Sequence, residues 1–133
     1  MKLTTKSEYS LLALIHLARH EKDGFVKVED ICDKYSLSKK YLEALFSTIK
    51  KKKLIETKRS AAGGYRLAKP SNRISIAEII RSMDGPLAPT RSASRYFHRS
   101  SPIEKEKKAL KVMREIREYV ANKLERLTLA DLI

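Results

Sequence analysis

The sequence predicts a mainly α-helical protein with a small β-hairpin wing, that is, a winged helix-turn-helix domain followed by a long C-terminal dimerisation helix. Three observations lead to this fold class. Apolar residues recur with helical spacing in SKKYLEALFSTIKKKKL, at residues 38–54. Two strand-like segments, LIETKR and YRLA, then flank the tight turn AAGG. The chain also holds 29 Lys and Arg against 16 Asp and Glu, a net charge of +13, and this excess is concentrated around the same segments.

The N-terminal residues are expected to form two helices. Thr4 and Thr5 are candidate caps of a first helix that ends at Gly24. The apolar face of this helix should contain Tyr9, Leu12, Ile15, Leu17 and Ala18, widened by Leu11 and Leu14. A short second helix is expected from Asp30 to Tyr35. Its inward residues should be Val28, Ile31 and Cys32.

A third helix should follow the turn at residues 36–38, with Ser38 as its N-cap. Its apolar positions are Tyr41, Leu42, Leu45, Phe46 and Ile49, and its solvent side is Lys39, Lys40, Glu43, Ser47 and Lys50. A helix, a short helix, a tight turn and a helix with an exposed polar face form the order of a helix-turn-helix motif.

The segments Leu54 to Arg59 and Tyr65 to Lys69 are expected to pair as the two strands of the wing. Gly63 and Gly64 would supply positive φ angles in the hairpin. A fourth helix is predicted from Ile74 to Met83, with Ser75 as its cap, and Asp84-Gly85-Pro86 should end it.

The basic residues are not spread evenly. Residues 38–66 contain nine basic side chains and two acidic ones. A local concentration of this kind favours a face that docks on a polyanion such as the phosphates of double-stranded DNA. The alternative is a solvated lysine-rich helix end, since lysine also suits the negative end of a helix.

The chain is expected to divide into residues 1–85, the DNA-binding winged domain, residues 86–102, a mobile loop rich in Pro, Ser and Arg, and residues 103–133, a dimerisation helix and tail. One apolar stripe is predicted on the last helix, at Ile103, Leu110, Met113, Ile116, Val120, Leu124 and Leu127. We expect a second copy of the chain to cover it. The alternative is that the helix folds back on its own domain.

Several functional classes find no support. The single cysteine, Cys32, excludes an internal disulfide framework and a cysteine-rich metal site within one chain. No apolar run reaches membrane-spanning length, so no membrane contact and a cytoplasmic location are expected. No nucleophile, nucleotide-binding loop or acid/base pair indicates an enzyme. His16 and His20 are one helical turn apart, which allows a metal site, although exposed histidines are common. Cys32 is expected to be a buried thiol rather than a redox switch.

Five motifs in order resemble the Rrf-two (Rrf2) family of bacterial winged helix-turn-helix transcription regulators, which are relatives of the iron–sulfur cluster regulator and the cysteine metabolism repressor. The resemblance covers essentially the whole chain. It is carried by MKLTTKSEY, LSKKYLEALFSTIKKKKLI, KRSAAGGYRLAKP, ISIAEIIRSMDGP and LERLTLADLI.

The resemblance implies a homodimer on a palindromic operator, with the third helix in the major groove and the wing in the minor groove. The DNA-binding residues so predicted are Ser38, Lys39, Lys40, Tyr41 and Glu43 in the helix, and Lys58, Arg59, Ser60, Ala61, Gly63, Gly64 and Tyr65 in the wing. Lys40 suits a guanine edge or a phosphate, Glu43 a cytosine amino group and Arg59 a narrow minor groove. The glycines should shape the wing, and Tyr41 is either a core residue or a contact.

Cluster-binding relatives carry three cysteines in the loop that follows the G-P. Here that loop reads LAPTRSASRYFHRSS, without cysteine, and Ser92 falls near the first of those positions. No iron–sulfur cluster is therefore expected. The chain resembles the cluster-free members, which sense a protein partner, a thiol or a small molecule.

These inferences together predict a sequence-specific transcriptional regulator that acts as a repressor. A different class remains open, in which the fold is a protein-interaction module and its basic face gives only non-specific affinity for nucleic acid.

Overall fold

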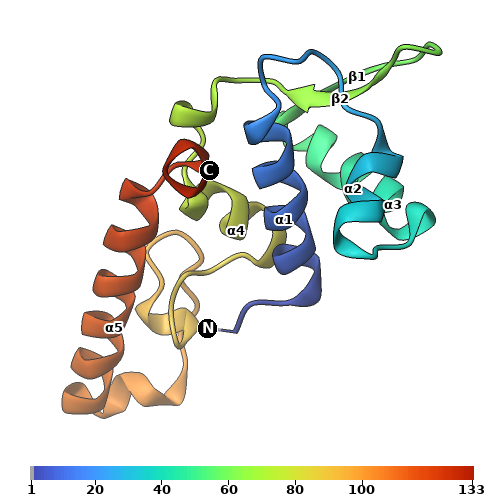
Figure 1. Ribbon diagram of the computed structural model, residues 1–133. Coiled ribbons are helices and arrows are strands. Elements are labelled where there is room, and N and C mark those ends of the chain that lie inside the picture. The colour runs from blue at the N-terminus through green and yellow to red at the C-terminus, as the bar shows by residue number, and fades with distance from the viewer. Residues whose placement is uncertain (1) are drawn as a thin grey trace.

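The computed structural model describes residues 2–133 and confirms a helical domain with one β-hairpin (Figure 1). Its helices and strands are α1 (Thr5–Arg19), α2 (Val28–Tyr35), α3 (Lys39–Lys51), β1 (Ile55–Lys58), β2 (Gly64–Leu67), α4 (Ile76–Asp84) and α5 (Lys107–Arg126). Helices α2 and α3 and the hairpin lie on one side of the molecule, and α5 runs along the other side (Figure 1). Helices α1 and α4 lie between them and separate the two regions.

The predicted N-caps are confirmed at three helices. The side-chain oxygen of Thr4 accepts a hydrogen bond from the Ser7 N–H at 3.2 Å. Ser38 and Ser75 cap α3 and α4 in the same way, at 3.2 and 3.0 Å. Each bond satisfies an N–H group that has no partner inside the helix, and so fixes where the helix begins. Helix α2 has no side-chain cap and begins at Val28, earlier than expected.

The buried face of α1 is rotated from the expected one. Tyr9, Leu12 and Ile15 are only half-buried, whereas Ser7 and Ser10 are fully buried beside Ala13, Leu14, Leu17 and Ala18. Helix α1 packs along α4, and small side chains on this face allow the two helices to approach closely. The helical periodicity of apolar residues did not predict this face, because serine is a polar residue and was not counted among the apolar positions.

A single hydrophobic core joins α1, α2, α3, the hairpin and α4 to the C-terminal tail. Its fully buried members include Leu14, Ile31, Phe46, Ile79 and Leu129. The tail enters this core because Thr128 pairs with Ser75 as an isolated β-bridge. The Leu129 N–H donates to the Ile74 carbonyl at 3.0 Å, and the Ile76 N–H donates to the Leu127 carbonyl at 2.9 Å. The end of the chain is therefore part of the winged domain's core.

Helix α5 has two apolar faces instead of the single predicted stripe. Leu110 and Ala121 are 7% and 0% exposed within this one chain, so the expectation that Leu110 needs a partner subunit for its burial is wrong. Val120, Leu124 and Leu127 pack at the edge of the chain's own core, and Ile103 and Met113 are half-buried. This face therefore agrees with the alternative that the helix folds back on its own domain.

The second face of α5 points outward. Val112, Ile116 and Tyr119 are 48%, 43% and 69% exposed, and their spacing places them on one side of the helix. Only Ile116 of these belonged to the predicted stripe, which runs between the two faces. Within residues 2–133, no helix combines the length and apolar composition needed to cross a bilayer.

Candidate nucleic-acid interface

A tight turn between α2 and α3 sets the start of α3. Ser36 ends α2 in the left-handed conformation, with φ at 56°. The Leu37 N–H donates to the Cys32 carbonyl at 3.0 Å, and Ser38 then caps α3. Ser38 therefore has a structural task in addition to the DNA contact predicted for it. Its hydroxyl hydrogen can still be donated outward.

The first turns of α3 present a polar surface. Lys39, Lys40 and Glu43 are exposed on it. Tyr41 is 39% exposed and meets the ring of Tyr9 edge to face, with ring centroids 5.7 Å apart. Tyr41 is thus neither a core residue nor a free surface contact, because one edge packs on α1 and the rest faces solvent.

The wing is an antiparallel hairpin whose register runs from Ile55 opposite Leu67 to Lys58 opposite Gly64. Side-chain alternation turns Ile55 and Leu67 inward and Lys58 outward. A third segment joins the hairpin edge, because the N–H and carbonyl of Val26 exchange hydrogen bonds with those of Tyr65 at 2.7 and 2.8 Å. The tip, formed by Arg59, Ser60, Ala61 and their neighbours, is exposed.

Gly63 and Gly64 shape this tip in different ways. Only Gly64 has a positive φ, at 153°, so the prediction of positive φ at both residues is wrong for Gly63. At Gly63 a Cβ atom would clash with the Lys58 carbonyl oxygen, and at Gly64 it would clash with that of Val26. Both positions need glycine because backbone approaches backbone there.

Tyr65 anchors the wing to α3. Its ring stacks on that of Phe46, with centroids 4.1 Å apart and an interplanar angle of 23°. The ring is half-buried, and this burial, with the nearby charges of Glu43 and Glu29, raises the pKa of the hydroxyl. Tyr65 therefore holds the hairpin against α3 and presents a neutral hydroxyl to the surface between them.

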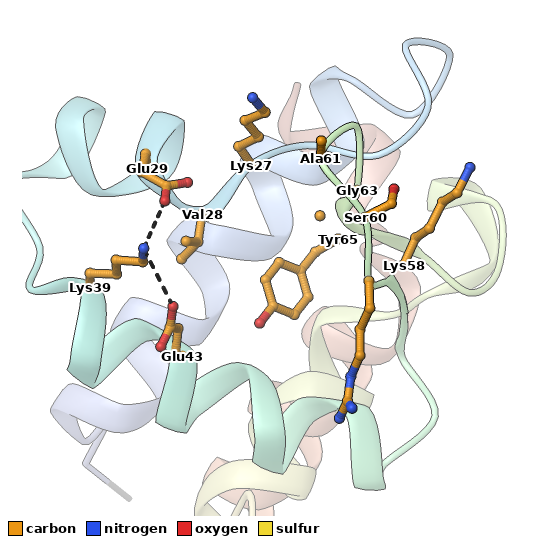
Figure 2. A pocket seen from close by; sticks show the side chains of 12 residues that line it. Lys27, Val28, Glu29, Lys39, Glu43, Lys58, Ser60, Ala61, Gly63 and Tyr65 are labelled. Atoms are coloured by element: carbon orange, nitrogen blue, oxygen red, sulfur yellow. Dashed lines mark ion pairs between the residues drawn. The ribbon is translucent and has the colours of Figure 1, made fainter.

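A groove of about 570 Å³ lies between the start of α3 and the wing (Figure 2). One wall carries Glu29, Lys39 and Glu43, and the other carries the wing from Lys58 to Gly64. A second hollow of about 260 Å³ continues it along α3 past Ser47 and Lys50. Nine predicted DNA-binding residues line the two hollows: Lys39, Glu43, Lys58, Arg59, Ser60, Ala61, Gly63, Gly64 and Tyr65. Ser38, Lys40 and Tyr41 lie outside them.

Charges within the groove are partly paired. The Lys39 ammonium lies 2.8 Å from a carboxylate oxygen of Glu29 and 4.0 Å from one of Glu43, as Figure 2 shows. The hydrogen bond from Lys39 lowers the pKa of Glu29, and the same bond raises the pKa of Lys39. Both groups are therefore charged at neutral pH. Lys39 is thus ion-paired in this structure, and the DNA contact expected of it stays a prediction.

The lysine run at the end of α3 contributes less to the groove than its position in the sequence suggests. Lys50 lines the second hollow and lies 3.4 Å from the Thr57 hydroxyl. Lys51, Lys52 and Lys53 line neither hollow. Lys51 ends α3 about 18 Å along the helix from Lys39, by the rise of 1.5 Å per residue, and Lys52 and Lys53 follow it. The alternative of a solvated helix end fits these three lysines.

Lys27 and Glu29 are groove residues that sequence reasoning missed. They belong to the start of α2, about thirty residues before the wing in the chain. The only local signal was the charged pair on either side of Val28, which reads as an ordinary helix start. Val26 brings this segment against the hairpin through its backbone bonds to Tyr65, and that is a tertiary contact.

A family model described as an iron-dependent transcriptional regulator, Rrf2, matches residues 3–133. The chain belongs to the Rrf2 family. This membership confirms the resemblance found in the sequence motifs. The regulators that the chain is similar to are not enzymes.

Among curated Rrf2 relatives, the transcriptional regulator IscR of Xenorhabdus nematophila is 37% identical over 91 residues, which is 68% of this chain and 56% of that protein. IscR of Yersinia pseudotuberculosis is 30% identical over 135 residues, covering 100% of this chain and 79% of the relative. The chain thus spans less than two thirds of the length of the Xenorhabdus protein and more of the Yersinia protein.

Solved structures of similar Rrf2 proteins share the fold. CymR (YrzC), the global cysteine regulator of B. subtilis, has a TM-score of 0.79 and 31% identity, with 99% of this chain and 95% of that chain covered. The IscR structure from T. potens has a TM-score of 0.76 and 29% identity, with coverages of 99% and 85%.

The donor atoms present do not fit a cluster held by several cysteine thiolates. The sequence has one cysteine, Cys32, and it lies in α2. Near the position expected for a first ligand, the buried Ser92 hydroxyl instead lies 3.0 Å from those of Thr90 and Ser101. Within residues 2–133 no three His, Cys, Asp or Glu side chains are grouped as metal ligands.

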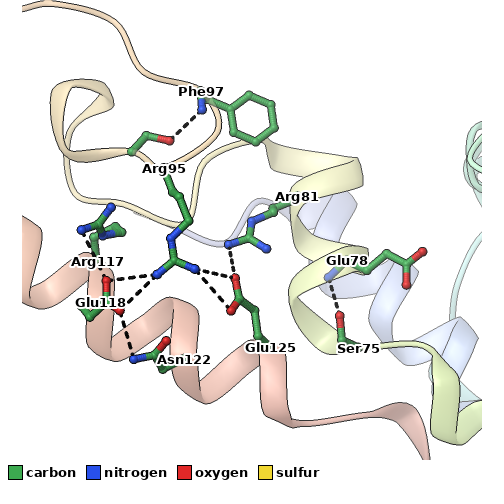
Figure 3. A network of polar contacts seen from close by, with 10 residues as sticks. Ser75, Glu78, Arg81, Arg95, Phe97, Arg117, Glu118, Asn122 and Glu125 are labelled. Atoms are coloured by element: carbon green, nitrogen blue, oxygen red, sulfur yellow. Dashed lines mark hydrogen bonds and ion pairs between the residues drawn. The ribbon is translucent and has the colours of Figure 1, made fainter.

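The segment around Ser92 is packed, unlike the mobile loop expected from its composition. Leu87, Ala88 and Ala93 are buried. Arg95 reaches α5, where its guanidinium lies 3.0 Å from Glu118 and 3.3 Å from Glu125 (Figure 3). Arg81 of α4 also binds Glu125, at 2.7 Å. The Arg95 contacts join the segment to α5, and Glu125 also joins α5 to α4 through Arg81.

Cys32 and the histidines have local explanations. Cys32 is half-buried rather than fully buried, and burial raises the pKa of its thiol, which leaves little thiolate for a redox reaction. The rings of His16 and His20 lie 4.6 Å apart, but His20 pairs with Asp23 at 2.9 Å. His16 is 6% exposed and packs against Tyr35.

Proposed function

We propose that this protein is a sequence-specific DNA-binding transcriptional regulator that acts as a homodimer on a palindromic operator and represses transcription. The observation that carries the proposal is the groove between the first turns of α3 and a basic, glycine-shaped wing. Family membership supports it, since Rrf2 proteins are transcriptional regulators.

In the proposed complex the start of α3 enters the major groove. Lys40 and Glu43 face base edges there, where lysine suits guanine and glutamate suits the amino group of cytosine. The phosphate strand between the two grooves of DNA occupies the hollow beside the wing. Arg59 then reaches the adjacent minor groove, whose negative potential attracts a guanidinium. Tyr65 and the two wing glycines set the distance between these two contacts.

The homodimer would form through the outward face of α5, at Val112, Ile116 and Tyr119. An exposed apolar stripe of this kind is usually covered by a partner. A two-fold dimer places two recognition helices about 34 Å apart, one turn of DNA, and this geometry matches a palindrome. A dimer seated on an operator that overlaps a promoter blocks the polymerase, which is the basis for proposing repression.

We further propose that regulation does not involve an iron–sulfur cluster. The serine hydroxyls near residue 92 support this part of the proposal. A signal would then reach the protein as a small molecule or a partner protein. An iron-reconstitution experiment tests this, since a bound cluster gives visible absorption and stoichiometric iron.

The experiment that tests DNA recognition is selection of fragmented genomic DNA by the purified protein at physiological salt, followed by sequencing. Enrichment of one palindrome near promoters supports the proposal. Uniform recovery of all fragments would contradict it and would favour the interaction-module class. With the enriched duplex, Arg59→Ala should weaken binding without changing the oligomeric state, whereas unchanged affinity would remove the minor-groove role of the wing.

A further inference from the structure

The Glu29 carboxylate lies in a groove whose charged lining residues are mainly basic. Lys27, Lys39, Lys58 and Arg59 line the main groove together with two carboxylates, Glu29 and Glu43. Glu29 comes from α2, not from the recognition helix, and its side chain is 53% exposed at the groove wall. Figure 2 shows its carboxylate directed at Lys39, across from the wing.

Lys39 is the common partner of both carboxylates, at 2.8 Å from Glu29 and 4.0 Å from Glu43. If its ammonium moved to a DNA phosphate, two carboxylates would be left beside the polyanion without that cation. Like charges at short range repel, so this transfer is opposed even though an isolated exposed ion pair is weak. Lys40, the next residue, is also exposed and takes part in no ion pair within residues 2–133.

We propose that Glu29 limits the sequence-independent affinity of the DNA interface: it holds the Lys39 ammonium in an ion pair and so withdraws one cation per subunit from contact with phosphate. This inference rests on the proposed DNA-binding function. Phosphate contacts strengthen binding to every sequence alike, whereas base contacts distinguish sequences. Removing one phosphate contact therefore lowers non-specific affinity and raises the share of the binding energy that depends on sequence.

The test is a double-mutant cycle on Glu29 and Lys39, because it separates the ion pair from a general effect of net charge. Affinity is measured by fluorescence anisotropy over a range of salt concentrations. One probe is the duplex that the wild-type protein enriches from genomic DNA, and the other is a scrambled duplex of equal length and composition. The variants are Glu29→Gln, Lys39→Gln and the double variant, with Lys40→Gln as a matched background in which Lys39 is intact.

Glu29→Gln is expected to bind both duplexes severalfold more tightly and to leave the ratio of the two affinities unchanged, because a phosphate contact adds the same free energy to each complex. The slope of log K against log salt should steepen by about 0.9 for each subunit, the value for one added phosphate contact. The same substitution should have this effect in the Lys40→Gln background but not in the Lys39→Gln background.

Two results would overturn the inference. One is an unchanged salt slope and an unchanged affinity for the scrambled duplex in Glu29→Gln. The other is an equal effect of Glu29→Gln with and without Lys39, which would mean that the carboxylate acts only through its own charge. A wild-type protein that does not distinguish the two duplexes would instead contradict the proposed function itself.

Discussion

At the scale of single residues, the position of the wing depends on Gly64, which has no Cβ atom. Gly64 combines a φ of 153° with a backbone so close to Val26 that no Cβ atom fits. The two backbone hydrogen bonds between Val26 and Tyr65 require that approach. Tyr65 in turn stacks on Phe46 of α3, so one glycine sets the position of the hairpin relative to the recognition helix.

Gly64→Ala is therefore expected to destabilise the fold by more than backbone strain alone, which costs about 1–3 kcal/mol. Gly24→Ala is the matched control, because Gly24 also has a positive φ, 84°, but has open space around its Cα. Urea unfolding of both variants measures the difference. Equal losses of stability would show that the close approach to Val26 carries no cost.

The lowered pKa of His16 predicts how the stability of the fold depends on pH. Burial, and then the neighbouring charge of His20, lowers the pKa of His16 from its usual 6.5. The unfolded chain thus takes up the proton first as pH falls, and the folded state loses stability below about pH 6.5. The dependence is at most about 1.4 kcal/mol per pH unit for one proton.

His16→Phe should flatten this loss between about pH 6.5 and 5, whereas His20→Gln should leave most of it in place. Free energies of unfolding at several pH values provide the measurement. A wild-type protein as stable at pH 5 as at pH 7.5 would contradict the assignment of this proton to His16.

At the scale of elements, α3 ends in a conformation that its sequence does not favour. Lys53 has a φ of 61°, in the left-handed region. The Leu54 N–H donates to the Ile49 carbonyl at 3.4 Å, and the Lys53 N–H donates to the Lys50 carbonyl at 2.9 Å. This bonding resembles the Schellman arrangement, in which glycine is the usual residue at the left-handed position.

Lys53→Gly is expected to stabilise the protein by up to about 1 kcal/mol, because the relief of left-handed strain exceeds the extra entropy of glycine in the unfolded chain. Lys52→Gly removes the same charge one residue earlier, where φ is −84°. It should destabilise instead. Thermal unfolding compares the two variants, and a loss of stability in both would show that φ at residue 53 is not strained.

At the scale of the whole molecule, the proposed DNA contacts and the proposed dimer contacts use opposite sides of the chain (Figure 1). Ile116 is 43% exposed near the middle of the outward face of α5. Ile116→Lys should shift the protein toward monomer, because a charge would have to be buried in the dimer. Lys111→Gln, on a different face of α5, should not.

Sedimentation equilibrium of the two variants and the wild type measures this shift. The folded monomer should survive in Ile116→Lys, since the Leu110 face of α5 is covered within the chain. A monomeric wild type would contradict the dimer, and a dimeric Ile116→Lys variant would place the interface elsewhere.

The sequence by itself determined the order of the elements, three of the helix caps and the glycine-shaped wing. These features depend on residues close together in the chain, where periodicity, capping and turn chemistry act directly. The family could also be inferred from the sequence, because each of its five motifs is a short run of neighbouring residues.

Only the tertiary structure decided which groups meet. Glu29 faces Lys39, the C-terminal tail completes the core, and α5 divides into one face inside the chain and one outside. A pattern along one helix shows that a side is apolar, but not which of several surfaces will cover it. That choice depends on contacts between residues far apart in sequence. For the same reason the sequence did not show that Lys39 is ion-paired with Glu29 in the groove.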